Sequence, residues 1–188
     1  MSRIAFRPAG PEVDAVLVHE WGHQPHVSPW WPELAVSLAE VGDYLAGQRA
    51  LAHLRPWIAL ADGIPLGYVE TYRAAEDPLA DHYPARPGDQ GWHVLVGPPE
   101  ALGSGRPRAM VRELVLALFR EPGAERVLCE PDARNGRMLS FCRRLGGQVE
   151  GLLDLPDKRA ALVVWTRERT ERLWPGAIAA GRPLGQAP

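Results

Sequence analysis

Lysine is almost absent from this chain. Of its 21 basic residues only Lys158 is a lysine, and the formal net charge of the 188 residues is −2. Arginine therefore carries nearly all the positive charge, a bias typical of a GC-rich genome. No basic block or stripe stands out along the sequence, which argues against a nucleic-acid-binding surface. We expect no nucleic-acid partner.

Cysteine and long apolar runs are also scarce. The two cysteines, Cys129 and Cys142, fall in an apolar strand pattern and a helical pattern, without the spacing of a disulfide framework or a metal site. No apolar run approaches the roughly 18 to 20 residues that span a bilayer, and the N-terminal MSRIAFRPAG lacks a signal-peptide core. These absences predict a cytoplasmic protein that does not bind a membrane.

The segment 19–31, HEWGHQPHVSPWW, is rich in histidine and tryptophan. Its histidines invite a metal interpretation, but a zinc site also needs a carboxylate or thiolate at a fixed spacing on a regular element, and Gly22, Pro25 and Pro29 break a helix here. We therefore expect no metal. The tryptophans more naturally wall a pocket or seal the core, because each offers a large apolar face with one polar edge.

The composition, with 46% apolar and 23% charged residues, fits one globular domain of ordinary size. We place this domain at residues 1–173. The remaining residues, 174–188, are rich in proline and glycine and have little periodicity, which predicts a loosely ordered tail. Both a monomer and a homodimer are compatible with the sequence.

The periodicity of apolar residues predicts a succession of strands and helices. A strong Asp-Gly hairpin signal joins two of the strands at residues 62–65. A helical region with interruptions near Gly42 and Gly47 precedes this hairpin. We expect strands or extended segments at Arg3–Arg7, Val13–His19, Pro56–Ala61, Leu66–Tyr72, Trp92–Val96, Arg126–Glu130, Gln148–Leu155 and Ala160–Thr166, and helices within Leu34–Leu54, after Pro107 and at Ala133–Leu145.

A glycine-rich turn separates the strand Trp92–Val96 from the helix that follows it. Such a turn lets an anion approach free backbone N–H groups, and the helix dipole adds to the attraction. Pro107 suits the first turn of the helix. The pattern therefore predicts a cradle for phosphate or pyrophosphate, although an ordinary glycine turn would look the same. The predicted cradle consists of Leu102, Gly103, Ser104, Gly105 and Arg106.

The segment 74–89, AAEDPLADHYPARPGD, is long, polar and proline-rich. A loop of this length inside a compact domain is usually functional or mobile. Its acidic and aromatic side chains suit a flexible, cationic substrate, with a solvated surface loop as the alternative. The candidate substrate-binding residues of this loop are Glu76, Asp77, His82 and Tyr83.

Several motifs resemble those of GNAT N-acyltransferases. The turn Glu100-Ala-Leu-Gly103-Ser-Gly105 is similar to the family's Arg/Gln-x-x-Gly-x-Gly/Ala loop, although Glu100 departs from it. Five ordered segments resemble the siderophore-biosynthesis branch, which includes hydroxylysine acetyltransferases and mycobactin-type lysine acyltransferases; the aminoglycoside 6′-N-acetyltransferases are near relatives. These segments are HVSPWW (26–31), GYVETYRAAEDPLADHY (67–83), GDQGWHVLVGPP (88–99), EPDARN (130–135) and LPDKRAAL (155–162).

The resemblance implies a mixed α/β fold with a central twisted sheet flanked by helices. It also implies transfer of an acetyl or succinyl group from acyl-CoA to a small-molecule amine or N-hydroxyamine, namely an N-hydroxylated diamine or lysine or its parent amine, on the way to a hydroxamate siderophore. An aminoglycoside acetyltransferase and a non-catalytic acyl-CoA-binding module are the alternatives. The sequence does not decide which acyl group is transferred or which amine accepts it.

His93 and Asp132 are the candidate catalytic residues. His93 is the only polar side chain of the strand Trp92–Val96, and an unperturbed imidazole, with a pKa of about 6.5, suits a general base. The resemblance places the substrate-side histidine here and assigns Asp132 to the substrate amine beside it. The alternatives are a structural histidine and an aspartate that caps the following helix.

The resemblance also implies contacts for the acyl-CoA and for the acceptor. Backbone N–H groups of the central strand would hold the thioester carbonyl, and an asparagine would face the CoA arm. Cys142 stands where many family members have the tyrosine that protonates the leaving thiolate, which leaves this step to water or another group. The acyl-CoA contacts are Leu95, Val96, Gly97 and Asn135, and the pocket walls are Trp30, Trp31 and Tyr72.

Overall fold

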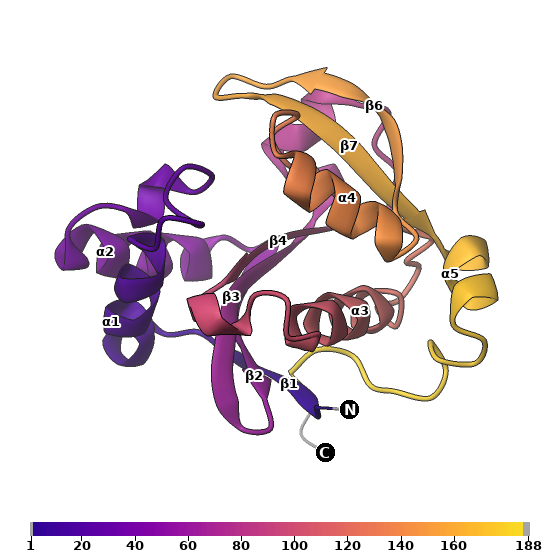
Figure 1. The fold of residues 1–188 in the computed structure, drawn as a ribbon. Helices are drawn as coiled ribbons and strands as arrows, with labels where there is room; N and C mark the ends of the chain where they lie inside the picture. Colours follow the sequence, from indigo (N-terminus) through magenta and orange to yellow (C-terminus); the bar gives the residue numbers. More distant parts are fainter. Residues whose placement is uncertain (1, 186–188) are drawn as a thin grey trace. The chain divides into compact units, whose positions relative to one another are not determined.

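The computed structural model describes residues 2–185 of the chain. Within this range the strands are β1 (Ile4–Pro8), β2 (Leu54–Ala61), β3 (Ile64–Arg73), β4 (Gln90–Val96), β5 (Arg126–Cys129), β6 (Gln148–Asp154) and β7 (Arg159–Thr166) (Figure 1). The α-helices are α1 (Pro11–Gly22), α2 (Leu38–Ala50), α3 (Arg106–Leu118), α4 (Gly136–Arg144) and α5 (Arg167–Leu173). Short 3₁₀ turns are η1 (Pro32–Leu34), η2 (Ala74–Glu76), η3 (Pro78–His82) and η4 (Pro99–Ala101).

The strands hydrogen-bond in the order β1-β2-β3-β4-β5-β7-β6. β4 and β5 run parallel, whereas β1–β2, β5–β7 and β6–β7 are antiparallel. A mixed sheet accompanied by helices confirms the predicted α/β class. By its internal contacts the chain divides into two compact units, which are described separately. The first contains the chain up to Thr71 together with His93–Val111, and the second contains Tyr72–Trp92 and the described residues from Arg112 onward.

The core of the first unit lies where α1 and α2, side by side in Figure 1, meet β2, β3 and β4. Asp62 and Gly63 both have positive φ, which is the backbone of the tight hairpin turn that the sequence predicts between β2 and β3. Burial of apolar side chains holds this unit together. The buried cluster consists of Ala9, Val18, Trp21, Val27, Leu34, Val41, Leu45, Ile58, Tyr68 and Leu95.

Two predictions for this unit are wrong. The segment Val13–His19 is helical within α1 and not extended. Pro11 at the first helical positions and acidic residues in the first turn favour a helix start here and outweigh the valine-rich composition. The helix α2 is also continuous through Gly42 and Gly47, because a capping box at Ser37 and its buried apolar side chains stabilise it.

A close contact fixes the end of β4 in the first unit. A Cβ atom on Gly97 would lie 2.1 Å from the indole ring of Trp21, so only glycine fits. We predict that Gly97→Ala lowers the free energy of unfolding by about 1–3 kcal/mol, the usual cost of overpacking. Thermal melts with Gly42→Ala as control would test this. Gly42 lies in a helix with open space around it, so that variant should gain about 0.5–1 kcal/mol.

The second unit is built on β5, β7 and β6 with α4 and α5 packed against β7. The rings of Trp92 and Trp165 lie 5.7 Å apart in its core, and the indole N–H of Trp165 donates to the carbonyl of Leu145 at 2.8 Å. The start of β4 pairs with β5 here, Gln90 opposite Val127. These contacts hold the start of β4, up to Trp92, in the core of this unit.

α4 begins later than predicted. The helix starts at Gly136 and not at Ala133, because the side chain of Asn135 accepts a hydrogen bond from the backbone N–H of Met138 at 3.0 Å and so forms its N-cap. A further short helix, α5, follows β7 and was not predicted. Thr166 caps it through the N–H of Arg169.

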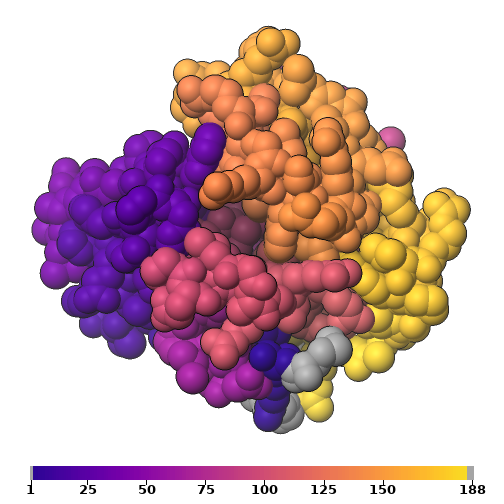
Figure 2. All heavy atoms as spheres, viewed as in Figure 1, coloured from indigo at the N-terminus to yellow at the C-terminus, as the bar shows by residue number. Residues whose placement is uncertain are grey.

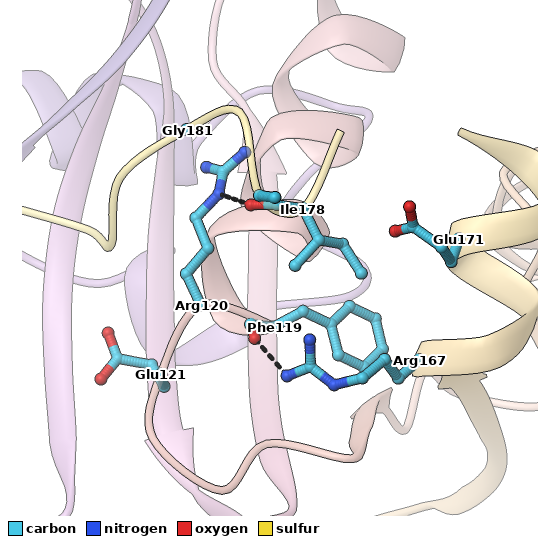
Figure 3. A pocket seen from close by; sticks show the side chains of 8 residues that line it. Phe119, Arg120, Glu121, Arg167, Glu171, Ile178 and Gly181 are labelled. Atoms are coloured by element: carbon cyan, nitrogen blue, oxygen red, sulfur yellow. Dashed lines mark hydrogen bonds between the residues drawn. The ribbon is translucent and has the colours of Figure 1, made fainter. Parts of the chain in front are cut away.

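The segment after α5 contacts Arg120 of the second unit. The guanidinium of Arg120 donates to the carbonyl of Ile178 at 2.8 Å (Figure 3) and to that of Ala177 at 2.9 Å. Beside this contact lies an open hollow of about 640 Å³. The looseness predicted for residues 174–188 stays a prediction, and residues 186–188 lie outside the described residues. The hollow is lined by Phe119, Arg120, Glu121, Arg167, Glu171, Ile178, Ala179 and Gly181.

Candidate active site

β3 and β4 bring a carboxylate against the predicted catalytic histidine. The Nδ1 atom of His93 lies 3.1 Å from Oε2 of Glu70, and both residues belong to the first unit. The Glu70 side chain is 2% exposed, whereas that of His93 is 35% exposed. A partly accessible imidazole is therefore anchored through one nitrogen to a buried acid, the arrangement in which a carboxylate orients a general base.

Two phenols hold the other oxygen of Glu70. The hydroxyl of Tyr44 donates to Oε1 at 2.7 Å and that of Tyr68 at 2.8 Å. Burial, and secondarily the charge of Glu70, raises the pKa of both tyrosines well above its ordinary value. Both tyrosines therefore remain protonated donors, and the buried carboxylate is well supplied with hydrogen bonds.

Trp31 completes this cluster. Its indole N–H donates to the Tyr44 hydroxyl at 3.2 Å, and its ring meets that of His93 edge-on with the centroids 5.9 Å apart. Trp31 thus lies beside the histidine, as expected of a pocket wall. Trp30 is 44% exposed. In the second unit Tyr72 is buried and donates to Glu130 at 2.6 Å. The substrate-binding roles of these three aromatics stay predictions.

Backbone groups at the end of β4 already have partners. The N–H of Gly97 donates to the carbonyl of Leu66 at 3.0 Å, and Nε2 of His26 lies 2.8 Å from the carbonyl oxygen of Val96. Leu95 is buried. The predicted thioester contact at Leu95–Gly97 is untested, and in the present conformation the N–H of Gly97 would have to leave Leu66 to make it.

The turn Leu102–Arg106 is exposed at the start of α3, on the face drawn in Figure 2, where this segment is pink. Gly103 and Gly105 have φ angles of 78° and 83°, and a Cβ on either would meet open space. Three backbone N–H groups of the turn already have partners: Leu102 donates to Pro99, Ser104 to Ala101, and Arg106 to the hydroxyl of Ser104. The open space at Gly103 and Gly105 would let a phosphate approach the backbone. The positive N-terminal end of the α3 dipole would attract it.

In the second unit Asp132 pairs with a neighbouring arginine. Arg134 donates to both carboxylate oxygens of Asp132, at 2.9 Å from Nε and 2.6 Å from Nη2. The hydrogen bonds from Arg134 lower the pKa of Asp132 to about 2. Asp132 is therefore an anion at neutral pH. The alternative in which Asp132 caps α4 is wrong, because Asn135 forms that cap.

The capping role of Asn135 bears on its predicted contact with the CoA arm. Its Oδ1 atom accepts the N–H of Met138, so the side chain is held at the start of α4. An amide can still donate through its NH₂ group. The predicted contact stays a prediction.

The loop 74–89 folds into the turns η2 and η3 in the second unit. Glu76 forms an exposed ion pair with Arg73, and Asp77 caps η3 through the N–H of Leu79 at 2.9 Å. His82 is exposed, whereas Tyr83 is buried and donates to Asp89 at 2.9 Å. Three of the four candidate side chains therefore have structural partners, two within the loop and one, Arg73, at the end of β3. Their roles toward a substrate are untested.

Cys142 is a core residue of the second unit. It is fully buried, and its Sγ lies 3.9 Å from that of Cys129, both thiols being free. Burial raises the pKa of Cys129 well above its ordinary value. The burial of Cys142 agrees with its interpretation as a small apolar core side chain.

Between residues 2 and 185 no three histidine, cysteine, aspartate or glutamate side chains gather as they would around a metal ion. Of the helices in that range, none has the length and apolar character needed to cross a bilayer.

The acid that binds His93 and the two tyrosines that bind this acid were not predicted from the sequence. Glu70 lies in the motif GYVETY, and a carboxylate inside an apolar strand is itself a signal, since acids are almost never buried without partners. The alternation Tyr68, Glu70 places both on one face of β3. Tyr44 lies on α2, and no sequence pattern connects it to this strand.

The match to a known domain decides the family. The family described as Acetyltransferase (GNAT) domain matches residues 10–155, most of the chain. The chain belongs to the GNAT acetyltransferases. The predicted family, its fold and an acyltransferase activity are thereby confirmed, whereas the individual site residues remain predictions.

Curated relatives and solved structures support this family assignment. The N-hydroxyputrescine acetyltransferase of Acinetobacter baumannii is 34% identical over 160 residues, covering 83% of this chain and 74% of the relative. The lysine N-acyltransferase MbtK of Mycobacterium sp. (strain MCS) is 29% identical, covering 97% and 75%. The structure of aminoglycoside acetyltransferase AAC(6′)-Ib with coenzyme A has a TM-score of 0.80 and 29% identity, covering 90% of this chain and 98% of that one.

Proposed function

We propose that this GNAT protein transfers an acyl group from acyl-CoA to the nitrogen of an N-hydroxylated diamine or amino acid, a step in the synthesis of a hydroxamate siderophore. The observation that carries the proposal is the imidazole of His93, anchored to buried Glu70 at 3.1 Å while its side chain stays 35% exposed. The similarity to an N-hydroxyputrescine acetyltransferase supports the choice of acceptor.

The chemistry follows from the properties of the acceptor. An N-alkyl hydroxylamine is less basic than an alkylamine, so its nitrogen lone pair is available at neutral pH. That nitrogen attacks the thioester carbonyl, forming the C–N bond, and His93 accepts the proton that the nitrogen loses. The C–S bond then breaks and the CoA thiolate leaves. Since Cys142 is buried in the core, we assign protonation of the thiolate to solvent.

The acyl-CoA would bind through the turn that precedes α3. Its open glycine backbone at Gly103 and Gly105 would face the pyrophosphate, with the positive end of α3 behind it. We propose acetyl-CoA as the first donor to test, because acetyl is the group in the name of the relative from Acinetobacter baumannii. Succinyl-CoA is the second.

The negative charge of Asp132 would attract a cationic group of the acceptor. Its carboxylate, with a pKa of about 2, remains ionised throughout the working range of pH. An ammonium group of a diamine or amino acid would find a permanent partner there, in competition with Arg134. We propose this role for Asp132 rather than a proton transfer, because a group with so low a pKa is a weak base.

The test is release of free thiol from acetyl-CoA and succinyl-CoA with N-hydroxyputrescine, N-hydroxylysine, putrescine, lysine and kanamycin as acceptors. We expect kcat/KM for one hydroxylamine to exceed the values for its parent amine and for kanamycin. Turnover of kanamycin alone would contradict the proposal and favour an aminoglycoside acetyltransferase, which the likeness to AAC(6′)-Ib supports. Binding of CoA without turnover of any acceptor would favour the non-catalytic module.

A further inference from the structure

We propose that Glu70 is a positioning residue that fixes the tautomer of His93, so that Nδ1 carries the proton and Nε2 is the atom that accepts the proton of the acceptor. This inference rests on the proposed function of His93 as the general base. It concerns only residues of the first unit.

The argument begins with what each atom can do. An ionised carboxylate accepts hydrogen bonds and has none to donate. The contact of 3.1 Å between Oε2 and Nδ1 is therefore a hydrogen bond only if Nδ1 carries a proton. In a neutral imidazole one nitrogen is protonated and the other has the lone pair, so protonation of Nδ1 leaves the lone pair on Nε2.

The surroundings hold the carboxylate of Glu70 in place. Tyr44 and Tyr68 both donate to Oε1, so this oxygen is already engaged and the carboxylate cannot rotate without losing two hydrogen bonds. Their phenols stay protonated because burial raises their pKa. Trp31 in turn donates to Tyr44 and packs its edge on the His93 ring. The carboxylate and the imidazole are thus held from several elements.

A structural role alone does not require a charge at this position. A neutral glutamine would also accept from two tyrosines, without the cost of burying an anion. The charge matters when His93 takes up a proton, because a buried carboxylate then stabilises the positively charged imidazolium. Nδ1–H stays where it is in this step, and only Nε2 gains a proton.

Glu70→Gln separates these two roles. The amide oxygen can still accept from the tyrosines, but the NH₂ group then faces Nδ1, which must accept. The proton of the imidazole moves to Nε2 and the base loses its lone pair there. We expect kcat/KM to fall about 10²–10⁴-fold, the range for removal of a general base. Glu12→Gln, which removes an exposed carboxylate on α1, should leave kcat/KM unchanged.

The decisive readout is the ¹⁵N spectrum of the His93 imidazole, which distinguishes the two tautomers without any acceptor. We expect the Nδ1–H form in the wild type and the Nε2–H form in Glu70→Gln. Tyr44→Phe, which removes one donor but keeps the carboxylate, should retain the Nδ1–H form. Rescue by Glu70→Asp should be partial, because its shorter side chain retains the charge but reaches less far.

Several results would overturn the inference. One is a wild-type imidazole with its proton on Nε2, which needs no variant and so holds even if Glu70→Gln does not fold. Another is a Glu70→Gln variant that keeps both the tautomer and the pH profile of the wild type. If the wild type turns over no acceptor, the proposed function fails, whereas the ¹⁵N spectra still decide the role of Glu70.

Discussion

His93→Ala should lower kcat/KM for the N-hydroxylated acceptor by about 10²–10⁴-fold, since it removes the proposed general base. The binding of acyl-CoA should change little, because the candidate phosphate turn at Gly103 and Gly105 remains intact. The rate that remains should also lose the decline toward acidic pH that protonation of an imidazole produces. Thiol release measured between pH 5.5 and 9 would show both effects.

The control is His23→Ala, which removes an exposed histidine at the end of α1 and should leave kcat/KM unchanged. Added imidazole should restore part of the rate of His93→Ala, because a free base can enter the space that the side chain leaves. A loss of less than threefold, with an unchanged pH profile, would show that His93 does not act as the base.

The features that stand out in the sequence each depend on residues that are close together along the chain. The hairpin at Asp62 and Gly63 depends on two adjacent residues that tolerate positive φ, and the structure has both there. His93 stood out because it interrupts an otherwise apolar alternation along one strand. The turn at Gly103 and Gly105 likewise rests on neighbouring glycines before a helix, whereas its role as a phosphate cradle stays a prediction. Short-range rules predicted these features because nothing distant competes with them.

Features that depend on distant contacts escaped prediction. The role proposed for Glu70 depends on its contacts with Tyr44, 26 residues earlier, and with His93, 23 residues later. No spacing rule connects three residues that come from a helix and two strands. The sequence could show an acid in an apolar strand, but only the packed fold shows which groups supply its hydrogen bonds.

Competition between local signals explains the other errors. Val13 and the valines after it favour a strand, whereas Pro11 and the acidic first turn favour a helix, and packing of the helix decided the outcome. Asp132 and Asn135 are both good N-cap residues. Asn135 caps α4 because Arg134 already holds the carboxylate of Asp132.

The largest effect on stability is expected at Asp89, which ends the loop 74–89 in the second unit. Its carboxylate accepts from Nε of Arg126 at 2.8 Å, and also from the hydroxyl of Tyr83 and the N–H of Arg86, each at 2.9 Å. The side chains of Asp89 and Arg126 are only 2% and 7% exposed. Removal of the acid would therefore leave a buried guanidinium whose remaining acidic partner, Glu150, lies 4.0 Å away and is 40% exposed.

We expect Asp89→Ala to lower the free energy of unfolding by about 3–5 kcal/mol, the cost of breaking a buried ion pair from one side. Urea denaturation would measure it, and amide exchange in residues 83–89 should accelerate because the loop loses its anchor. Glu168→Ala is the matched control: its partner Arg172 is 68% exposed, so we expect a loss of about 0.3–0.5 kcal/mol. Equal losses in the two variants would show that burial of Arg126 does not govern the stability of this loop.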